Sequence, residues 1–165
     1  MKCYVYSKRD FEKLMRDYGW NKTTDVPDSV AIISICCTED CIRGYLAARD
    51  PDADDNHWFD HSTSNIINID FDDIIDDEFE SNGYIYRCIT NEQAKELHDF
   101  IWNNKGKDFY IHCRAGKSRS QAVGRYIRET FEGYEERKDN PCLYGNINVL
   151  NKLRRIDYNY ENTDR

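Results

Sequence analysis

The apolar positions of the chain fall into short continuous runs separated by polar stretches. The longest run covers 30–36 and predicts a strand that is buried on both faces of a sheet. Shorter runs predict further strands over 2–6, 66–71 and 108–113. The stretch 49–64 has no clear period and is expected to form a long loop.

Helical periodicity, with apolar residues three and four positions apart, fills segments between these strands. Three predicted helices begin next to a side chain that can cap them: Ser7 before about 8–18, Thr90 with Gln93 before a helix that ends near Gly106, and Asn146 before a helix through about 156. A fourth helical pattern begins at Ser118. The segment 132–146 is predicted to be a loop, and the polar tail 157–165 is expected to fray. The alternation of strands and helices favours a layered α/β domain.

Composition and charge narrow the function classes. The chain has 165 residues, of which 13% are aromatic, so it is expected to fold as one domain over 1–165. A formal net charge of -8 argues against a generally basic nucleic-acid binder. No apolar run approaches the ~20 residues of a membrane span, and the first residues lack the apolar core of a signal peptide. Seven cysteines, an odd number, then favour free thiols in a reducing cytoplasm.

The segment His112–Ser120 carries the candidate chemistry. Its sequence is His-Cys-Arg-Ala-Gly-Lys-Ser-Arg-Ser: a predicted strand ends, a five-residue loop follows and a helix begins. Backbone N–H groups and a helix amino terminus then converge on one point, which favours a bound oxyanion such as phosphate. The candidate phosphate-binding residues are Arg114, Ala115, Gly116, Lys117, Ser118 and Arg119. Glycine permits a loop conformation that a side chain would obstruct, and an arginine fork holds two phosphate oxygens.

Cys113 is the candidate nucleophile of this loop. The loop amides, the helix dipole and Arg119 would favour its thiolate form. A thiolate beneath a bound phosphate is aimed at phosphorus. The hydroxyl of Ser120 would stabilise the thiolate when it leaves again. His112 is expected to pack beneath the loop and to steady it through hydrogen bonds to the backbone.

This segment resembles the signature loop of the cysteine-dependent protein tyrosine phosphatases, Cys-x5-Arg followed by Ser or Thr. The form His-Cys-x-Ala-Gly-x-Ser-Arg-Ser is similar to the compact, dual-specificity-like members, particularly those of bacteria and tailed phages. The resemblance covers 30–131 and implies a phosphotyrosine protein phosphatase-like fold, a central, mostly parallel sheet flanked by helices. It implies hydrolysis of phosphotyrosine, phosphoserine or phosphothreonine in proteins, in the cytoplasm or, for a phage protein, in that of the host. No metal or other cofactor is implied.

The resemblance also implies a general acid, usually an Asp on a loop after an earlier strand. Asp72 and Asp73 directly follow the predicted 66–71 strand. The second Asp matches the loop of the relatives better, so Asp73 is favoured and Asp72 is the alternative. Some phosphatases of this type protect the nucleophile by a reversible disulfide with a cysteine on the neighbouring strand, so Cys36 is the candidate redox partner. A register shift of one residue would exchange it for Cys37.

Two alternative functions remain open. Arg114 and Lys117 are additional loop cations, and phosphatases of this group that act on phosphoinositides carry basic residues at those positions. A phosphoinositide or an inositol phosphate is therefore an alternative substrate. An interaction module that binds phosphate without useful turnover is the alternative of another class.

Two further groups of residues are interpreted as structural. Cys36, Cys37 and Cys41 are clustered, but no second pair of cysteines has the spacing of a zinc site, so no metal site is predicted. The histidines outside the loop are expected on the surface or at helix edges: His57, His61 and His98.

Overall fold

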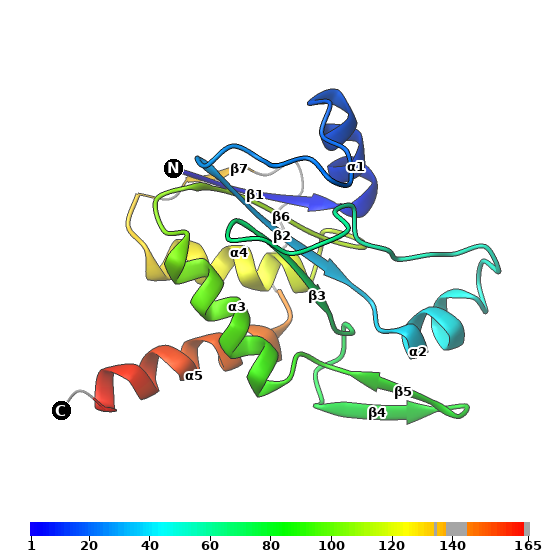
Figure 1. The fold of residues 1–165 in the computed structure, drawn as a ribbon. Helices are drawn as coiled ribbons and strands as arrows, with labels where there is room; N and C mark the ends of the chain where they lie inside the picture. Colours follow the sequence, from blue (N-terminus) through cyan, green and yellow to red (C-terminus); the bar gives the residue numbers. More distant parts are fainter. Residues whose placement is uncertain (134, 138–144, 164–165) are drawn as a thin grey trace.

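A computed structural model of the chain describes residues 1–133, 135–137 and 145–163. Five strands form its main sheet, in the spatial order β3-β2-β6-β1-β7 (Figure 1). Their bounds are β1 (Lys2–Ser7), β2 (Val30–Cys36), β3 (Ile66–Asp70), β6 (Asp108–Cys113) and β7 (Glu135–Arg137). Every neighbouring pair is parallel, so the expected α/β class with a parallel central sheet is confirmed.

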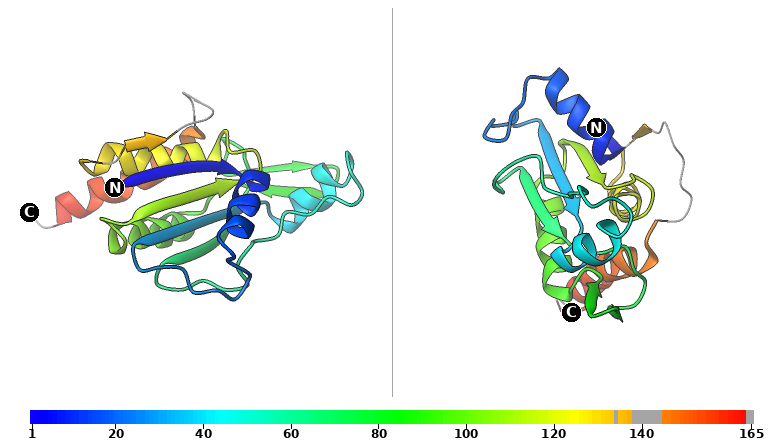
Figure 2. Two further views of the ribbon diagram at one scale, coloured as in Figure 1. Left: turned by 90° about the horizontal axis from the view of Figure 1, so that it is seen from above. Right: turned by 90° about the vertical axis from the view of Figure 1, so that its right-hand side faces the viewer.

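Helices cover both faces of this sheet (Figures 1 and 2). The long helices are α1 (Lys8–Asp17), α3 (Asn91–Asn103), α4 (Arg119–Thr130) and α5 (Ile147–Thr163). α3, α4 and α5 share the larger hydrophobic core with one face, whereas α1 packs through Phe11 and Met15 on the other. No helix among the described residues combines the length and the apolar character needed to cross a bilayer.

The central strand β2 shows why a continuous apolar run was predictive. All of its side chains are buried, because alternate residues enter the cores on opposite faces of the sheet. Ile33 and Ile35 join the larger core, while Ile32 joins the core beneath α1. The carboxyl ends of these parallel strands lie at one edge of the sheet, which is where open α/β sheets bind their ligands.

The predicted starts of three helices are confirmed by their hydrogen bonds. Ser7 accepts from the backbone of Asp10 at the start of α1, and Thr90 forms a capping box with Gln93 at the start of α3. Asn146 Oδ1 accepts from the first turn of α5.

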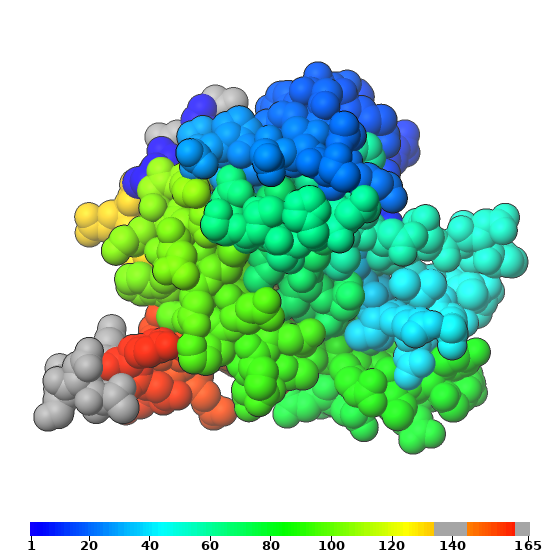
Figure 3. Space-filling view, viewed as in Figure 1, coloured from blue at the N-terminus to red at the C-terminus, as the bar shows by residue number. Residues whose placement is uncertain are grey.

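Two small elements were not predicted, and both lie near the end of the sheet that carries the segment His112–Ser120. The first is a helical turn, α2 (Glu39–Cys41), which continues as a π-helical turn, η1 (Ile42–Leu46). The second is a hairpin of β4 (Glu78–Ser81) and β5 (Tyr84–Arg87), whose Asn82-Gly83 turn has positive φ at both residues. They pack together at one end of the molecule, where Figure 3 shows the cyan and green segments in contact.

Two predictions about the carboxyl-terminal part are corrected. The loop expected over 132–146 contains β7, an edge strand, while 138–144 lies outside the described residues. The tail expected to fray from Asp157 is instead the continuation of α5 to Thr163. Asp157 Oδ1 bonds to the hydroxyl of Tyr126 at 2.9 Å and to His98 Nε2 at 2.9 Å, which ties this half of the helix to α4 and α3. His98 is therefore buried and not at a surface edge.

Candidate active site

The segment between β6 and α4 forms a tight loop against the end of β1. Gly116 has a φ of +66°, and a Cβ there would lie 2.5 Å from the backbone nitrogen of Ser7. The backbone of Lys8 also donates to the carbonyl of Arg114 at 3.1 Å. Glycine is therefore required at this position by both its conformation and the close approach of two backbones.

Cys113 and Ser120 meet at the base of this loop, as the sequence predicted. The two atoms, Cys113 Sγ and Ser120 Oγ, are 3.0 Å apart, and both residues are buried. The strand β6 ends at the cysteine, and the serine lies in the first turn of α4. A hydroxyl in this place can donate a hydrogen bond to a sulfur that carries negative charge.

Arg119 is buried, with only 3% of its surface exposed, and hydrogen bonds hold its guanidinium in a fixed orientation. Its Nη1 donates to the carbonyl of Cys36 at 3.0 Å and to that of Phe71 at 2.7 Å, which are the ends of β2 and β3. Burial lowers the pKa of Arg119, but Cys37, Cys113, Asp55 and Asp73 together outweigh burial, and the pKa is raised above its usual value. Its Nε has no hydrogen-bond partner among the described residues. A buried, charged N–H without a partner is available for an oxyanion.

A pocket of about 380 Å³ opens beside these residues. It is lined by Cys37, Cys41, Tyr45, Leu46, Asp72, Asp73, Ile74, Tyr86, Cys113, Arg114, Ala115, Ser118 and Arg119. The signature loop supplies part of the lining, and η1 and β5 supply apolar and aromatic side chains. The two elements that the sequence analysis missed therefore shape the site, and the Asn82-Gly83 pair was the signal for one of them.

The two candidate acids have different surroundings. Asp72 is 1% exposed and accepts three hydrogen bonds, from the backbone of Thr38 at 2.9 Å, from its hydroxyl at 2.7 Å and from the backbone of Arg87 at 2.9 Å. These bonds join the end of β3 to α2 and to β5. The carboxylate of Asp72 thus holds the walls of the pocket together.

Asp73 is exposed and faces the signature loop. Its Oδ1 accepts from the hydroxyl of Ser118 at 2.7 Å and from Nδ2 of Asn146 at 3.0 Å. Asn146 was predicted only as a helix cap, and nothing in the local sequence indicated its second bond. Of the two carboxylates, Asp73 is therefore the one that is exposed and bonded to the signature loop, and both line the pocket.

His112 lies beneath the loop, but its hydrogen bond differs from the expectation. Its Nε2 is 2.7 Å from Ser34 Oγ, where the sequence analysis expected the backbone, and Phe11 stacks on its ring at 4.2 Å. Burial, together with the nearby cationic groups, lowers the pKa of His112 to about 3. The ring is therefore neutral at physiological pH and serves as a fixed support.

The depressed pKa of His112 predicts an acid-sensitive fold. The unfolded chain binds a proton at this residue below about pH 6.5, whereas the folded chain does not until about pH 3, so stability falls as the pH is lowered. Between about pH 7.5 and pH 5 this loss amounts to about 2 kcal/mol. Urea unfolding at the two pH values should show that His112→Gln loses about 2 kcal/mol less than the parent chain. Equal losses in both proteins would contradict this assignment.

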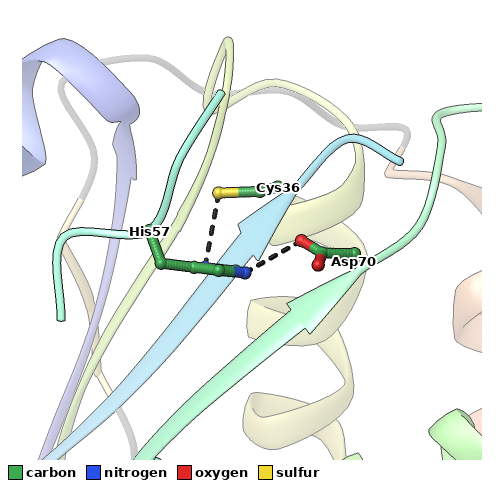
Figure 4. A group of neighbouring side chains, drawn as sticks. All are labelled: Cys36, His57 and Asp70. Carbon is green, nitrogen blue, oxygen red and sulfur yellow. Dashed lines mark hydrogen bonds and ion pairs between the residues drawn. The ribbon is translucent and has the colours of Figure 1, made fainter. Parts of the chain in front are cut away.

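Ser34 links His112 to a second histidine, His57, that the sequence analysis placed on the surface. Ser34 Oγ is 2.7 Å from His57 Nδ1, and His57 Nε2 is 2.8 Å from Asp70 Oδ1. Figure 4 shows the imidazole between the carboxylate of Asp70 and the sulfur of Cys36, which is 3.3 Å from Nδ1. A chain of side chains thus runs from beneath the loop to the surface. The unpatterned 49–64 segment gave no signal for it.

The structure does not bring Cys36 to Cys113. The register pairs Ser34 with His112, so Cys36 lies on the His112 face of the sheet, opposite to Cys113. Burial raises the pKa of Cys36. Its neighbour Cys37 lies on the other side, lines the pocket and is 3.4 Å from Arg119 Nη2. The alternative partner is the one that the geometry places beside the signature loop.

The two additional cationic side chains of the loop, Arg114 and Lys117, have different contacts. Arg114 Nη1 donates to the carbonyl of Asp54 at 2.8 Å and is 3.8 Å from Asp55 Oδ1. Asp55 is fully buried, accepts from the backbone of Cys37 at 2.7 Å and ties the long loop to the site. Lys117 is exposed and does not line the pocket. Only Arg114 therefore reaches the pocket, and its charge is shared with an acidic partner.

Comparisons of the chain with known proteins identified no relative. No family model matches the chain, and neither a curated protein nor a solved structure matches it. The likeness to a phosphatase signature therefore rests on the sequence of the segment His112–Ser120.

Proposed function

We propose that this protein is a cysteine-based phosphatase that hydrolyses phosphate monoesters, with phosphotyrosine in proteins as the favoured substrate. The observation that carries the proposal is the grouping of Cys113, whose Sγ is 3.0 Å from Ser120 Oγ, with Arg119 along one pocket. Arg119 also has a buried Nε without a partner among the described residues. A nucleophile, an oxyanion site and a carboxylic acid, Asp73, are then within one cavity. These are the parts that phosphoryl transfer through a thiol needs.

In the first step of the proposed reaction, the thiolate of Cys113 attacks phosphorus. The S–P bond forms while the bond from phosphorus to the ester oxygen breaks, and that oxygen takes a proton from Asp73. Arg119 Nε and the N–H groups of the loop bind the equatorial phosphate oxygens, where negative charge is concentrated. The guanidinium of Arg119 is already oriented before a substrate binds, because its Nη1 donates to two backbone carbonyls.

In the second step, a water molecule gives a proton to Asp73 and attacks phosphorus. The P–S bond breaks, its electron pair returns to Cys113, and inorganic phosphate leaves. The hydroxyl of Ser120 donates to the sulfur as its charge returns. No step requires a metal ion or an organic cofactor.

The walls of the pocket favour an aryl ester over an alkyl ester. Tyr45, Leu46 and Tyr86 line the pocket together with the signature loop, and aromatic side chains pack well against a phenyl ring. The alternative, an inositol phosphate, would need free cations around the pocket. Arg114 is instead held by Asp54 and Asp55.

Release of para-nitrophenol from its phosphate ester tests the proposal against a binding module. The full chain, reduced and treated with a chelator, is expected to turn over many molecules of ester per molecule of protein. A phosphotyrosine peptide should be hydrolysed faster than the matched phosphoserine peptide. Binding of phosphate without turnover would support the interaction module and overturn the proposed enzyme.

The position of Cys37 yields a redox prediction that also rests on the proposed function. Peroxide is expected to oxidise Cys113 to a sulfenic acid, which the thiol of Cys37 then condenses to a disulfide with release of water. Mass spectrometry should find a peptide that links Cys113 to the 36–37 segment in the Cys36→Ser variant but not in Cys37→Ser. Activity should return with dithiothreitol. Retention of the link in Cys37→Ser would instead favour Cys36.

A further inference from the structure

A second group of potential ligands lies on the wall of the same pocket. Cys37, Cys41 and Asp72 each offer one ligand atom, and these atoms all lie within 4.8 Å of one another. All three residues are buried and line the pocket. None of them takes part in the catalytic steps proposed above. The hydrogen bonds of Asp72 and the expected redox role of Cys37 do not account for the convergence of three ligand atoms.

The fold brings these three residues together through two strand ends. Cys37 follows β2 and Asp72 lies just beyond β3, and these strands are parallel neighbours. Thr38 begins α2 and donates twice to Asp72, which fixes the carboxylate against the helix. Cys41 lies in the first turn of α2, which begins directly after Cys37 and Thr38, and its sulfur comes within 4.8 Å of the ligand atoms of Cys37 and Asp72. The sequence showed no further ligand for the two cysteines, and the carboxylate of Asp72, just beyond β3, supplies a third ligand.

We propose that Cys37, Cys41 and Asp72 bind a thiophilic divalent cation, with Zn²⁺ as the best match. Zinc takes four ligands in a tetrahedron, with sulfur at about 2.3 Å and carboxylate oxygen at about 2.0–2.2 Å. Atoms already within 4.8 Å reach such positions through small side-chain rotations. The site has three protein ligands, and because all three residues line the pocket, water or a small anion from the pocket would take the fourth position.

The charges around the group suit a bound cation. Two thiolates and one carboxylate carry three negative charges, one more than a divalent cation neutralises. Arg119, whose Nη2 is 3.4 Å from Cys37 Sγ, supplies the balancing positive charge. Asp72 accepts three hydrogen bonds, whereas a carboxylate offers about four lone pairs, so one remains for the metal. Binding releases the two thiol protons to solvent, and affinity therefore rises with pH.

A neighbouring trio fits a cation less well. Cys36, His57 and Asp70 also lie close together, but Figure 4 shows that each ring nitrogen of the histidine faces a different partner. Nδ1 faces Cys36 at 3.3 Å and Nε2 faces Asp70 at 2.8 Å, so no single nitrogen addresses both. Ser34 also bonds to Nδ1. This trio is the natural control for the proposed site.

Titration of the reduced full chain with Co²⁺, followed by displacement with Zn²⁺, tests the proposal. One ion per chain is expected, with a thiolate-to-cobalt charge-transfer band and visible bands of tetrahedral cobalt. Cys41→Ser should weaken binding by at least about tenfold. Cys36→Ser should leave the spectrum unchanged, and so should Cys113→Ser, which abolishes the proposed catalysis but not this site.

A second measurement does not depend on whether a variant folds. X-ray absorption at the zinc edge of the unmodified protein should show two sulfur neighbours at about 2.3 Å and lighter atoms beyond them. The proposal is overturned by one sulfur or none, by loss of the cobalt bands in Cys36→Ser or Cys113→Ser, or by full affinity in a folded Cys41→Ser. Because the readouts are binding and coordination, they are independent of the phosphatase assay.

Discussion

Cys113→Ser is expected to lower kcat for phosphate monoesters by on the order of 10⁴ or more, while the affinity for phosphate changes little. The reason is that the nucleophile and the oxyanion site are different atoms. A serine hydroxyl is a far weaker nucleophile than a thiolate, but Arg119 and the loop amides remain in place. Steady-state kinetics give kcat, and calorimetry with inorganic phosphate gives the affinity.

Cys88→Ser is the matched control for this substitution. Cys88 is also buried, but it does not line the pocket, so its loss should leave kcat close to that of the parent chain. Substantial turnover by purified Cys113→Ser would exclude the thiol mechanism. An equal loss in both variants would indicate damage to the fold and not to the chemistry.

Asp73→Asn is expected to lower kcat by about 10²–10⁴, the usual contribution of a positioned general acid. The effect should depend on the leaving group, because an alkoxide needs protonation far more than a good aryl leaving group does. An amide at this position still accepts from Ser118 and keeps the local packing, but it carries no exchangeable carboxylic proton. A series of aryl phosphates with different phenol pKa values measures this dependence.

Asp72→Asn is the contrasting variant for that series. An amide there loses acceptor capacity for the three donors of Thr38 and Arg87, so the free energy of unfolding should fall by about 1–3 kcal/mol. Its kcat should show no added dependence on the leaving group. If Asp72→Asn shows the steep dependence and Asp73→Asn does not, the roles of the two residues are reversed.

The elements that the sequence predicted well depend on local physics. β2 is a continuous apolar run because both of its faces are buried, and the capping box of Thr90 and Gln93 is made within four residues. The meeting of Cys113, Ser120 and Arg119 is likewise local, since a strand, a short loop and a helix start are adjacent in the chain. Such features need no knowledge of distant contacts.

The remaining features depend on contacts between distant segments. Cys36 and Cys37 differ by one residue but lie on opposite sides of the sheet, and only the register with β6 tells them apart. The α5 helix continues beyond Asp157 because Tyr126 and His98 bind that residue, which its polar local sequence does not reveal. The buried acceptor role of Asp72 arises in the same way.

Trapping of the covalent intermediate would show directly whether the sulfur of Cys113 carries the phosphoryl group. Ser120→Ala and Asp73→Asn should each slow the breakdown of a phosphocysteine, so this intermediate should accumulate during turnover. Rapid quenching then preserves it for analysis. Peptide mapping by mass spectrometry then locates the phosphate. Phosphate is expected on the sulfur of Cys113. Phosphate on another residue, or continued turnover in these variants with no phosphate on the protein, would contradict it.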